Sequence, residues 1–408
     1  MGDVVDLWGS GERGVVDLTD LGEEFRRDPH PVYARLRERG PVHRVLLGGA
    51  DGAWETWLVV GYEEARAALA DGRLAKDQRG LAAGDPDESA ISRHLLGTDP
   101  PEHTRLRSLV TRAFTARRVQ GLAPRVQEIT DGLLDAMIPR GRADLVDAFS
   151  FPLPITVICE LLGVPELDRA AFRAMSTEVV APSGPGTGPE AFARLSGYLT
   201  ELIEDKRCTA PTDDLLSDLI RTTAEDGDRL SRAELRGMAF LLLIAGHETT
   251  VNLITNTVHT LLTRPALLDA LRADPGLLDG VIEETLRWEG PVENATYRYA
   301  AQPLEIGGAR IAKGASVVIG LAAPNRDPAR YPDPDRFDPR RDTRGHLAFG
   351  HGIHYCLGAP LARLEARTAI ASLLERAPGL ALDGPAGEWL PGMLIRGVRS
   401  LPVRWSTG

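Results

Sequence analysis

Residues 349–363 read Phe349-Gly350-His351-Gly352-Ile353-His354-Tyr355-Cys356, followed directly by Leu357-Gly358-Ala359-Pro360-Leu361-Ala362-Arg363. The residues after Cys356 have the pattern of a helix start, because proline is tolerated in the first turn and Pro360 would lie there. The glycines before it let the backbone pass close to a bulky, flat group. Cys356 is therefore predicted to lie at a helix N-terminus, where unpaired N–H groups and a partial positive charge favour a thiolate that can bind iron.

A buried structural thiol is the alternative for Cys356, because most isolated intracellular cysteines are of that kind. Core packing needs neither the glycines nor the paired histidines that precede this residue, so we favour a metal ligand. The two other cysteines lack such a setting. Cys159 lies in an apolar run and is predicted to be core, and Cys208 is predicted to be an ordinary thiol near a helix end.

A long helix is predicted from Ser231, which forms a capping box with Glu234, to the residue before Pro265. It would hold about 30 residues and measure roughly 45 Å. Inside it, the run 245–250 (Ala-Gly-His-Glu-Thr-Thr) places an acid and two threonines in an apolar stretch, which is costly unless they are paired. A threonine hydroxyl there can bond the carbonyl one turn back and open a groove for dioxygen, beside an acid able to relay protons. The alternative is a kinked core helix with solvated polar residues.

The rest of the chain is predicted to be mostly helical. Alternating and apolar runs around a glycine-rich turn indicate a hairpin of 41–47 and 54–60, and short strands are expected at 304–306 and 316–321. Residues 78–98 have no clear period and are predicted to form a long surface loop. Helical patterns cover the remaining segments, at 63–70, 101–147, 156–162, 189–206, 277–289 and 361–377.

Glu284 and Arg287 stand three residues apart on one face of the helix predicted at 277–289, where they can form an ion pair. Taken alone, such a pair is most often exposed to solvent. A proline-rich run that contains Arg336 follows later in the chain.

These motifs, in this order, resemble those of the cytochrome P-450 family. Phe349, Gly352, His354, Cys356 and Gly358 match its haem-binding loop, 245–249 matches its oxygen-activating motif, and Glu284 with Arg287 matches its ExxR helix. The resemblance spans about 29–402. It implies a mainly α fold with small β-sheets, in which a long central helix lies over the haem.

The resemblance also implies roles for individual residues. Cys356 would be the axial thiolate ligand of haem b, and Glu248 and Thr249 would deliver protons during oxygen activation. Glu284, Arg287 and Arg336 would form a structural network that fixes the cysteine loop. The remaining haem contacts implied by the family are His103, Arg107, Ala245, Arg298, Phe349, His354 and Gly358. Of these, His103, Arg107, Arg298 and His354 would hold the propionates, for which the alternative is a set of surface ion pairs.

A substrate pocket is harder to place, because apolar residues at helical spacing are more often core. The candidates are Leu95, Val292, Asn294, Met393 and Leu394. Asp85, Asp87 and Glu88 could attract a cationic substrate group, although a solvated acidic loop is the simpler explanation.

Composition limits the class of protein. The 408 residues carry no obvious linker and are expected to form one domain, 1–408, with 1–20 weakly ordered. A net charge of −11 argues against binding to nucleic acid or anionic membranes. We find no export signal or apolar membrane span, so a monomeric cytoplasmic protein is expected.

The resemblance implies a monooxygenase that uses O2 and electrons from NAD(P)H through a ferredoxin and its reductase. Arg112, Arg117, Arg118, Arg363 and Arg367 could form the basic face that meets the ferredoxin. The expected reaction is hydroxylation or epoxidation of a hydrophobic natural product, a macrolide or other polyketide in antibiotic biosynthesis. A steroid- or terpenoid-like substrate, a haem-thiolate sensor, or a binding protein without turnover are the alternatives.

Overall fold

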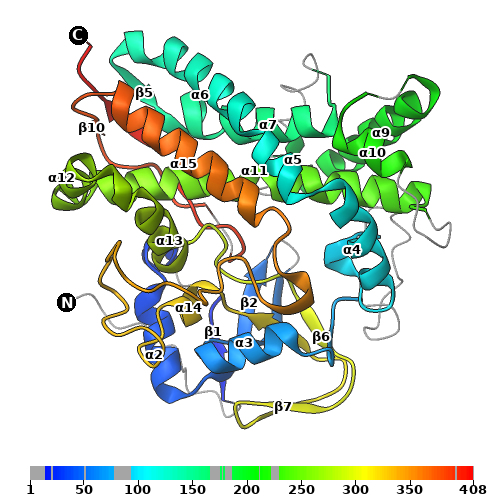
Figure 1. Cartoon of the computed structure of the whole chain (residues 1–408). Coiled ribbons are helices and arrows are strands. Elements are labelled where there is room, and N and C mark those ends of the chain that lie inside the picture. The colour runs from blue at the N-terminus through cyan, green and yellow to red at the C-terminus, as the bar shows by residue number, and fades with distance from the viewer. Residues whose placement is uncertain are drawn as a thin grey trace. The chain divides into compact units, whose positions relative to one another are not determined.

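The computed structural model describes residues 14–19, 22–49, 52–77, 93–165, 175–176, 178–179, 186–210, 212–221, 229–390 and 393–407 (Figure 1). The chain groups into two compact units, each built from separated segments. Unit 1 comprises Met1–Pro86, Glu283–Tyr355 and Glu388–Arg396, and unit 2 comprises Asp87–Ile282, Cys356–Gly387 and Gly397–Gly408.

Unit 1 is built on a six-stranded sheet of order β1-β2-β3-β9-β6-β4. The strands are β1 (Val15–Asp17), β2 (Val42–Gly49), β3 (Gly52–Val59), β9 (Ser316–Ile319), β6 (Arg298–Ala300) and β4 (Leu74–Ala75). β7 (Leu304–Ile306) and β8 (Ala309–Ile311) form a separate two-stranded ribbon. The predicted hairpin is the antiparallel pair β2 and β3, with Val42 opposite Val59 and Gly49 opposite Gly52.

The sheet has an apolar core on each face, because side chains alternate along its strands. Val317 and Ile319 lie in one cluster with residues of α3 (Tyr62–Ala70), whereas Val318 lies in the other with residues of α2 (His30–Arg39). The other described helices of unit 1 are α1 (Gly22–Arg27), α14 (Ala322–Asn325) and the 3₁₀ turn η6 (Gly352–His354). α13 (Leu278–Glu289) begins in unit 2, and its larger part, from Glu283, lies in unit 1.

The expectation that 1–20 is weakly ordered is wrong for Val15–Asp17. These residues form β1 and pair in parallel with β2, with Val16 opposite Val45. Val16 is buried in the core on the α2 side of the sheet. Burial of this side chain and the ladder hydrogen bonds order a segment whose overall polarity suggested otherwise.

Unit 2 is helical, with one small sheet of order β10-β11-β5. Its strands are β10 (Ala381–Leu382), β11 (Pro402–Arg404) and β5 (Arg142–Asp144). Its helices are α4 (Glu102–Ala113), α5 (Ala116–Gly121), α6 (Ala123–Met137), α7 (Pro152–Leu162), α9 (Thr187–Cys208), α10 (Leu215–Arg221), α11 (Arg232–Leu262), α12 (Pro265–Ala273) and α15 (Ala359–Arg376). Short 3₁₀ turns lie at η1 (Leu95–Gly97), η2 (Ile138–Arg140) and η5 (Pro275–Leu277), and η3 (Val146–Ser150) is a π-helical stretch.

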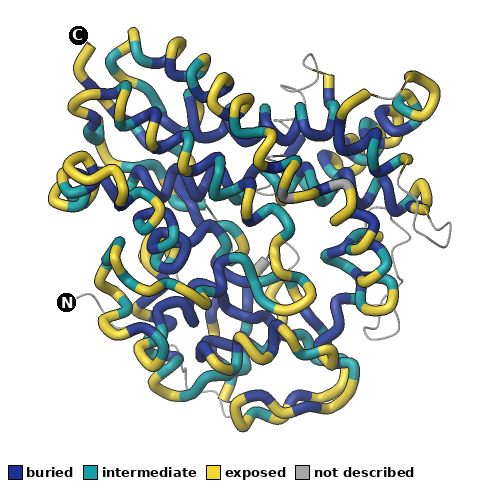
Figure 2. Tube along the Cα trace, viewed as in Figure 1, coloured by how far each residue is buried: buried dark blue, intermediate teal, exposed yellow. Residues whose placement is uncertain are grey.

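The helix α11 is the predicted long helix, and it packs against α7, α9 and α15 (Figure 1). Its capping box is complete, because Ser231 accepts the N–H of Glu234 while the Glu234 carboxylate accepts the N–H of Ser231. Among the described helices α11 alone is long and apolar enough to cross a membrane. Most of that stretch is buried inside the protein, so α11 is a core helix. Figure 2 shows buried residues in dark blue.

The helical pattern predicted over 101–147 is interrupted in the structure. It forms α4, α5 and α6, and then gives way to η2, β5 and η3. Thr115 caps α5 by accepting the N–H of Arg118, and Pro124 lies in the first turn of α6. Gly141, with φ of 68°, ends η2 in the left-handed conformation. These local signals stop a helix even where the apolar period continues.

A close contact between Gly397 and α11 generates the first prediction. A Cβ at Gly397 would overlap the side-chain oxygen of the buried Asn252, whose amide nitrogen Nδ2 donates to the Glu248 carbonyl at 2.8 Å. We expect Gly397→Ala to lower the free energy of unfolding by about 1–3 kcal/mol, because either the backbone or this bond must move.

Gly132→Ala is the matched control for that change. Gly132 lies inside α6, and the space that a Cβ would occupy there is open. The alanine is therefore expected to raise the free energy of unfolding by at most about 1 kcal/mol. Denaturant unfolding of both variants is the measurement, and equal effects would contradict the packing argument.

Candidate active site

Cys356 lies just before α15, and its sulfur accepts hydrogen bonds from the N–H groups of Gly358 and Ala359. The guanidinium groups of Arg107 and Arg363 also favour the thiolate. Burial opposes them and raises the pKa of the Cys356 thiol above its usual range, although the residue keeps accessible surface. The donors of the helix start thus favour the thiolate, as predicted, and burial opposes them. A bound metal ion, which deprotonates a thiol outright, would supply the remaining stabilisation.

Two glycines of the loop are required by the backbone. Gly350 and Gly352 both have φ of 74°, a left-handed conformation that other residues adopt at a cost. A Cβ on Gly352 would also lie 3.0 Å from the Leu69 carbonyl oxygen. The loop glycines thus shape the turn, and the approach of a flat group to them stays a prediction.

His103 and Arg107 lie on one face of α4, as predicted. His103 is buried, and burial together with Arg107 lowers its pKa. Burial lowers the pKa of Arg107, while Cys356 raises it, which places the Arg107 guanidinium near the sulfur. Unit 2 therefore brings together Cys356 and two of the four predicted propionate partners.

The acid and the hydroxyl of α11 are adjacent in the same unit. Thr249 Oγ1 donates to the Ala245 carbonyl at 3.0 Å, the bond one turn back that the sequence predicted. Ala245 is exposed and Thr249 partly so, whereas Glu248 and most of the helix beyond are buried. This turn of α11 therefore presents its polar groups to accessible space. Leu95 instead is buried beside α11, where its N–H contacts the Met238 sulfur at 3.5 Å.

In unit 1, Arg298 and the aromatic residues of the loop are held by their own neighbours. Arg298 begins β6 and is buried, and it donates to the Leu69 carbonyl at 3.1 Å. The Phe349 ring lies 6.4 Å from that of Tyr355. His354 ends η6 and is half-buried.

Four of the predicted pocket residues come from two segments about a hundred residues apart, and unit 1 joins these segments. Val292 pairs with Ile395 in an isolated antiparallel bridge, and Glu293 N–H donates to the Leu394 carbonyl at 2.9 Å. The Asn294 amide donates to the Met393 carbonyl at 2.7 Å. Val292, Asn294, Met393 and Leu394 are thereby brought together.

A buried charge network that the sequence analysis missed fixes this junction. Arg396 forms an ion pair with Glu289 at the end of α13 and donates to the carbonyls of Arg26 and Arg27, both at 2.9 Å. Burial opposes ionisation of Glu289, but Arg396 and its other cationic neighbours prevail and lower its pKa. His30 lies 3.9 Å from the same carboxylate, and burial, with Arg326, lowers its pKa to about 4. His30 is thus neutral near pH 7.

Comparison with known proteins decides the family. Residues 187–377 match the model of the cytochrome P450 family, written here cytochrome P-450. The chain is 57% identical to cytochrome P-450 monooxygenase PikC of Streptomyces venezuelae, over 97% of this chain and 95% of that protein. It is 44% identical to 6-deoxyerythronolide B hydroxylase of Saccharopolyspora erythraea, over 94% and 97%. The chain belongs to the cytochrome P-450 family.

A solved structure agrees with this assignment. The tirandamycin C-bound P-450 monooxygenase TamI superposes with a TM-score of 0.87 at 46% identity, covering 95% of this chain and 99% of that one. The predicted mainly α fold with small sheets is therefore confirmed, as are the haem cofactor and the monooxygenase class. The residues present fit haem, because two backbone N–H groups and Arg107 surround a cysteine sulfur that keeps accessible surface.

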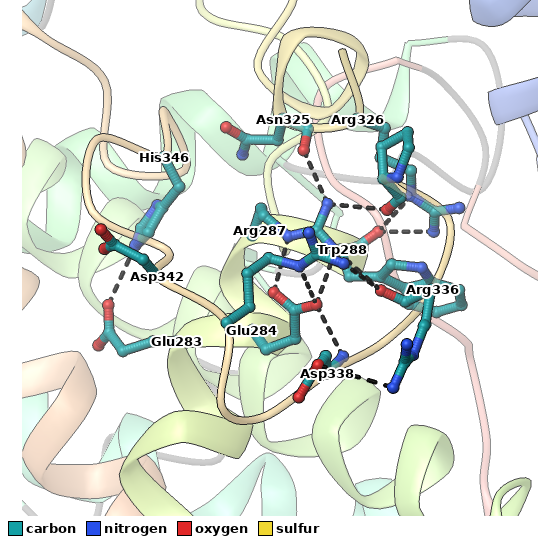
Figure 3. A network of polar contacts seen from close by, with 12 residues as sticks. Glu283, Glu284, Arg287, Trp288, Asn325, Arg326, Arg336, Asp338, Asp342 and His346 are labelled. Carbon is teal, nitrogen blue, oxygen red and sulfur yellow. Dashed lines mark hydrogen bonds and ion pairs between the residues drawn. The ribbon is translucent and has the colours of Figure 1, made fainter. Parts of the chain in front are cut away.

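The P-450 ExxR pair is fully buried (Figure 3). Arg287 donates to Glu284 through Nε and Nη2, both at 2.7 Å, and to the carbonyls of Asn325 and Pro334, both at 2.9 Å. Glu284 also accepts the N–H of Asp338 at 2.9 Å. The pair thus ties α13 to the segment that leads into the cysteine loop.

The prediction that the Arg336 side chain completes this network is wrong. Its guanidinium is exposed and lies 3.8 Å from Asp338, and Arg336 contributes only its carbonyl to the network (Figure 3). Arg341 is the third charged member: its Nε lies 3.2 Å from Glu284, and its Nη2 donates to the carbonyls of Asp333 and Arg336. The loop folds back beyond Arg336, so the later arginine reaches the carboxylate.

Two of the five arginines predicted to meet the ferredoxin are engaged in ion pairs within the protein. Arg118 forms ion pairs with Asp213 and Asp218, and Arg367 pairs with Asp279 at 2.6 Å. Arg112, Arg117 and Arg118 line an open recess of about 560 Å³. Asp85, Asp87 and Glu88, named as possible contacts for a cationic substrate, lie outside the described residues.

The second prediction compares Arg341 with Arg336. Arg341→Ala leaves Glu284 short of one cation and several carbonyls without their donor, so unfolding should become easier by about 2–4 kcal/mol. Arg336→Ala removes an exposed side chain and should change stability by less than about 0.5 kcal/mol. Thermal unfolding and haem content of the two purified proteins are the readouts. A larger loss for Arg336→Ala would restore the original assignment.

Proposed function

We propose that this cytochrome P-450 hydroxylates or epoxidises a hydrophobic polyketide, of the macrolide class, in bacterial antibiotic biosynthesis. The carrying observation is the 57% identity to PikC over nearly the whole chain, together with the Cys356 and Thr249 arrangements. The relatives named 6-deoxyerythronolide B hydroxylase and mycinamicin IV hydroxylase/epoxidase support the same class.

Cys356 would hold the haem iron through its sulfur, and His103 and Arg107 would hold a propionate. Arg298 and His354 remain predicted partners of the propionates, and Ala245, Phe349 and Gly358 remain predicted haem contacts. When bound, haem supplies the oxidising chemistry, in which dioxygen is activated with electrons and protons. The protein orients the substrate, excludes water and moves the protons.

Thr249 and Glu248 would handle those protons. The Thr249 hydroxyl donates its hydrogen to the Ala245 carbonyl, which leaves its oxygen free to accept a further hydrogen bond. Such an oxygen can hold a water or a protonated group in place beside the accessible turn of α11. Glu248, one residue away, can release a proton from its carboxyl group and take up another.

Val292, Asn294, Met393 and Leu394 would line the substrate pocket. Their two segments are joined by backbone bonds and by the Glu289–Arg396 pair, so their relative position is fixed before a substrate binds. Leu95, buried beside α11, is a weaker candidate.

A second substrate class has direct support from other relatives. Vitamin D(3) 25-hydroxylase of Pseudonocardia autotrophica is 47% identical, and pentalenic acid synthase of Streptomyces avermitilis is 44% identical. A steroid- or terpenoid-like substrate is therefore the alternative. We further propose a monomeric, cytoplasmic protein without affinity for membranes or nucleic acid, which takes electrons from NAD(P)H through ferredoxin reductase and ferredoxin.

The test of the substrate class uses 6-deoxyerythronolide B, mycinamicin IV, tirandamycin C and vitamin D3 as probes. We expect the polyketides to shift the Soret band and to give a product one oxygen heavier with ferredoxin, its reductase and NADPH. A shift and product with vitamin D3 alone would favour the alternative class. Binding without any product would indicate a sensor or binding protein. Absence of the red-shifted carbon monoxide spectrum of a thiolate-ligated haem would overturn the whole proposal.

The proton role predicts that Thr249→Ala and Glu248→Gln each lower product formation by roughly 10²-fold. NADPH consumption should persist and yield hydrogen peroxide, because electrons still arrive while proton delivery fails. Thr255→Ala is the matched control, since Thr255 makes the same type of bond to the Val251 carbonyl, at 2.9 Å, on the buried part of α11. Equal losses in Thr249→Ala and the control would show a merely structural effect.

A further inference from the structure

His247, the neighbour of Glu248 on α11, is a fully buried imidazole to which the proposed mechanism gives no role. Its Nδ1 lies 2.7 Å from the Leu243 carbonyl oxygen. Its Nε2 lies 3.2 Å from the hydroxyl of Ser176 and 3.3 Å from the carboxylate of Glu248. The ring therefore contacts the residue to which we assign proton delivery.

The positions of the protons follow from these partners. A carbonyl oxygen only accepts hydrogen bonds, so Nδ1 carries a hydrogen. A lone pair on Nε2 would repel an ionised carboxylate at 3.3 Å, and the contact is favourable only if one proton lies between the two groups. That proton belongs either to the imidazolium or to the carboxylic acid. The 3.3 Å separation is an ion-pair distance, so transfer of the proton requires the Glu248 carboxylate to turn toward Nε2.

Ser176 offers Nε2 a second hydrogen-bonding state. When the ring is neutral, the Ser176 hydroxyl can donate to Nε2, which then needs no proton from Glu248. The two partners of Nε2 thus favour opposite forms of the ring: the carboxylate favours the imidazolium and the hydroxyl favours the neutral imidazole. Such a ring can lose and regain a proton while it stays hydrogen-bonded throughout.

The surrounding packing holds the ring in this place. The edge of Phe151 meets it with centroids 5.6 Å apart. A Cβ on the preceding Gly246 would lie 2.9 Å from Ile158 on α7, so the two helices approach closely here. Together with the Leu243 bond, these contacts fix the imidazole with Nε2 hydrogen-bonded to Ser176 and close to the Glu248 carboxylate.

The elements packed against α11 carry further titratable side chains, among them Asp147 of η3, Cys159 and Glu160 of α7, Glu201 and Glu204 of α9, and Glu365 of α15. Within the described residues, the hydrogen bonds and the ion pair of His247 run to Leu243, Ser176 and Glu248, and to none of these groups. Glu160 is bonded to Arg125, and burial raises the pKa of Glu365 to about 8, which leaves it mostly neutral near pH 7. Glu248 is thus the titratable partner of the ring in this part of the protein.

We propose that His247 is a positioning residue that shares a proton with Glu248 and returns one to it after each delivery. The proton leaves Nε2 and binds the Glu248 carboxylate, and the Ser176 hydroxyl then turns to donate to Nε2. The inference rests on the proposed role of Glu248. It adds Ser176 and His247 as the groups that determine how readily Glu248 is protonated again.

The direct test is a histidine titration that requires no substrate. The holoenzyme, reduced and bound to carbon monoxide, is labelled in its histidine rings, and the His247 signal is identified by its loss in His247→Gln. We expect Glu248→Gln to lower the midpoint of this titration by about one pH unit or more, because the anionic partner is gone. Ser176→Ala should raise it, because the neutral ring loses its donor. A midpoint unmoved by both changes would overturn the proposal.

A turnover measurement separates this inference from the role of Glu248. With 6-deoxyerythronolide B as the probe, His247→Gln should lower product per NADPH about threefold or more and change its pH profile, whereas His259→Gln on the same helix should not. If Glu248→Gln uncouples turnover while His247→Gln matches the wild type, His247 has no part in the relay. If Glu248→Gln itself has no effect, the proposed function of that residue fails. Should His247→Gln not fold, the His247 signal is identified by elimination, from glutamine variants of the other eight histidines, and Ser176→Ala and Glu248→Gln still decide through the titration.

Discussion

The buried ion pair of Glu284 and Arg287 is the constraint on which the segment of unit 1 that leads into the cysteine loop depends. Both side chains are fully buried, so each charge must be satisfied by protein groups. Arg287 reaches the carbonyls of Asn325 and Pro334, and Glu284 reaches the N–H of Asp338 and the side chain of Arg341. Burial of these charges is unfavourable unless every one of these contacts is made. The chain between α14 and the cysteine loop therefore has few other conformations that satisfy them.

The long helix α11 also buries polar groups, and several of their hydrogen bonds are made within the helix itself. Its buried hydroxyls and amide groups bond to carbonyls one turn back, as Asn252, Thr255 and Thr257 show, and the partly exposed Thr249 makes the same bond. This keeps polar atoms satisfied in an apolar setting without partners from other helices. At Ala245 and Thr249 the helix surface meets accessible space, and at His247 its polar interior depends on a group from another segment.

Much of the candidate site could be predicted because its chemistry is carried by residues close in sequence. The bond from Thr249 to Ala245, the capping box of Ser231, the pairing of Glu284 with Arg287 and the helix start after Cys356 all lie within one or two turns of chain. The charge state of Cys356 could not be predicted in the same way. Helix-start donors are visible in sequence, but the burial that opposes them belongs to the folded chain.

The sequence by itself determined the family, its haem cofactor and the long helix that bears the acid and the hydroxyl, because motif spacing and backbone propensity encode each of them. Only the tertiary structure decided that Arg341 and not Arg336 meets Glu284, that Arg396 locks the segments of Val292 and Met393 together, and that Ser176 faces His247. Those partners lie tens to hundreds of residues apart. Which of several similar charges comes within about 3 Å depends on how intervening loops turn, and no local pattern records that.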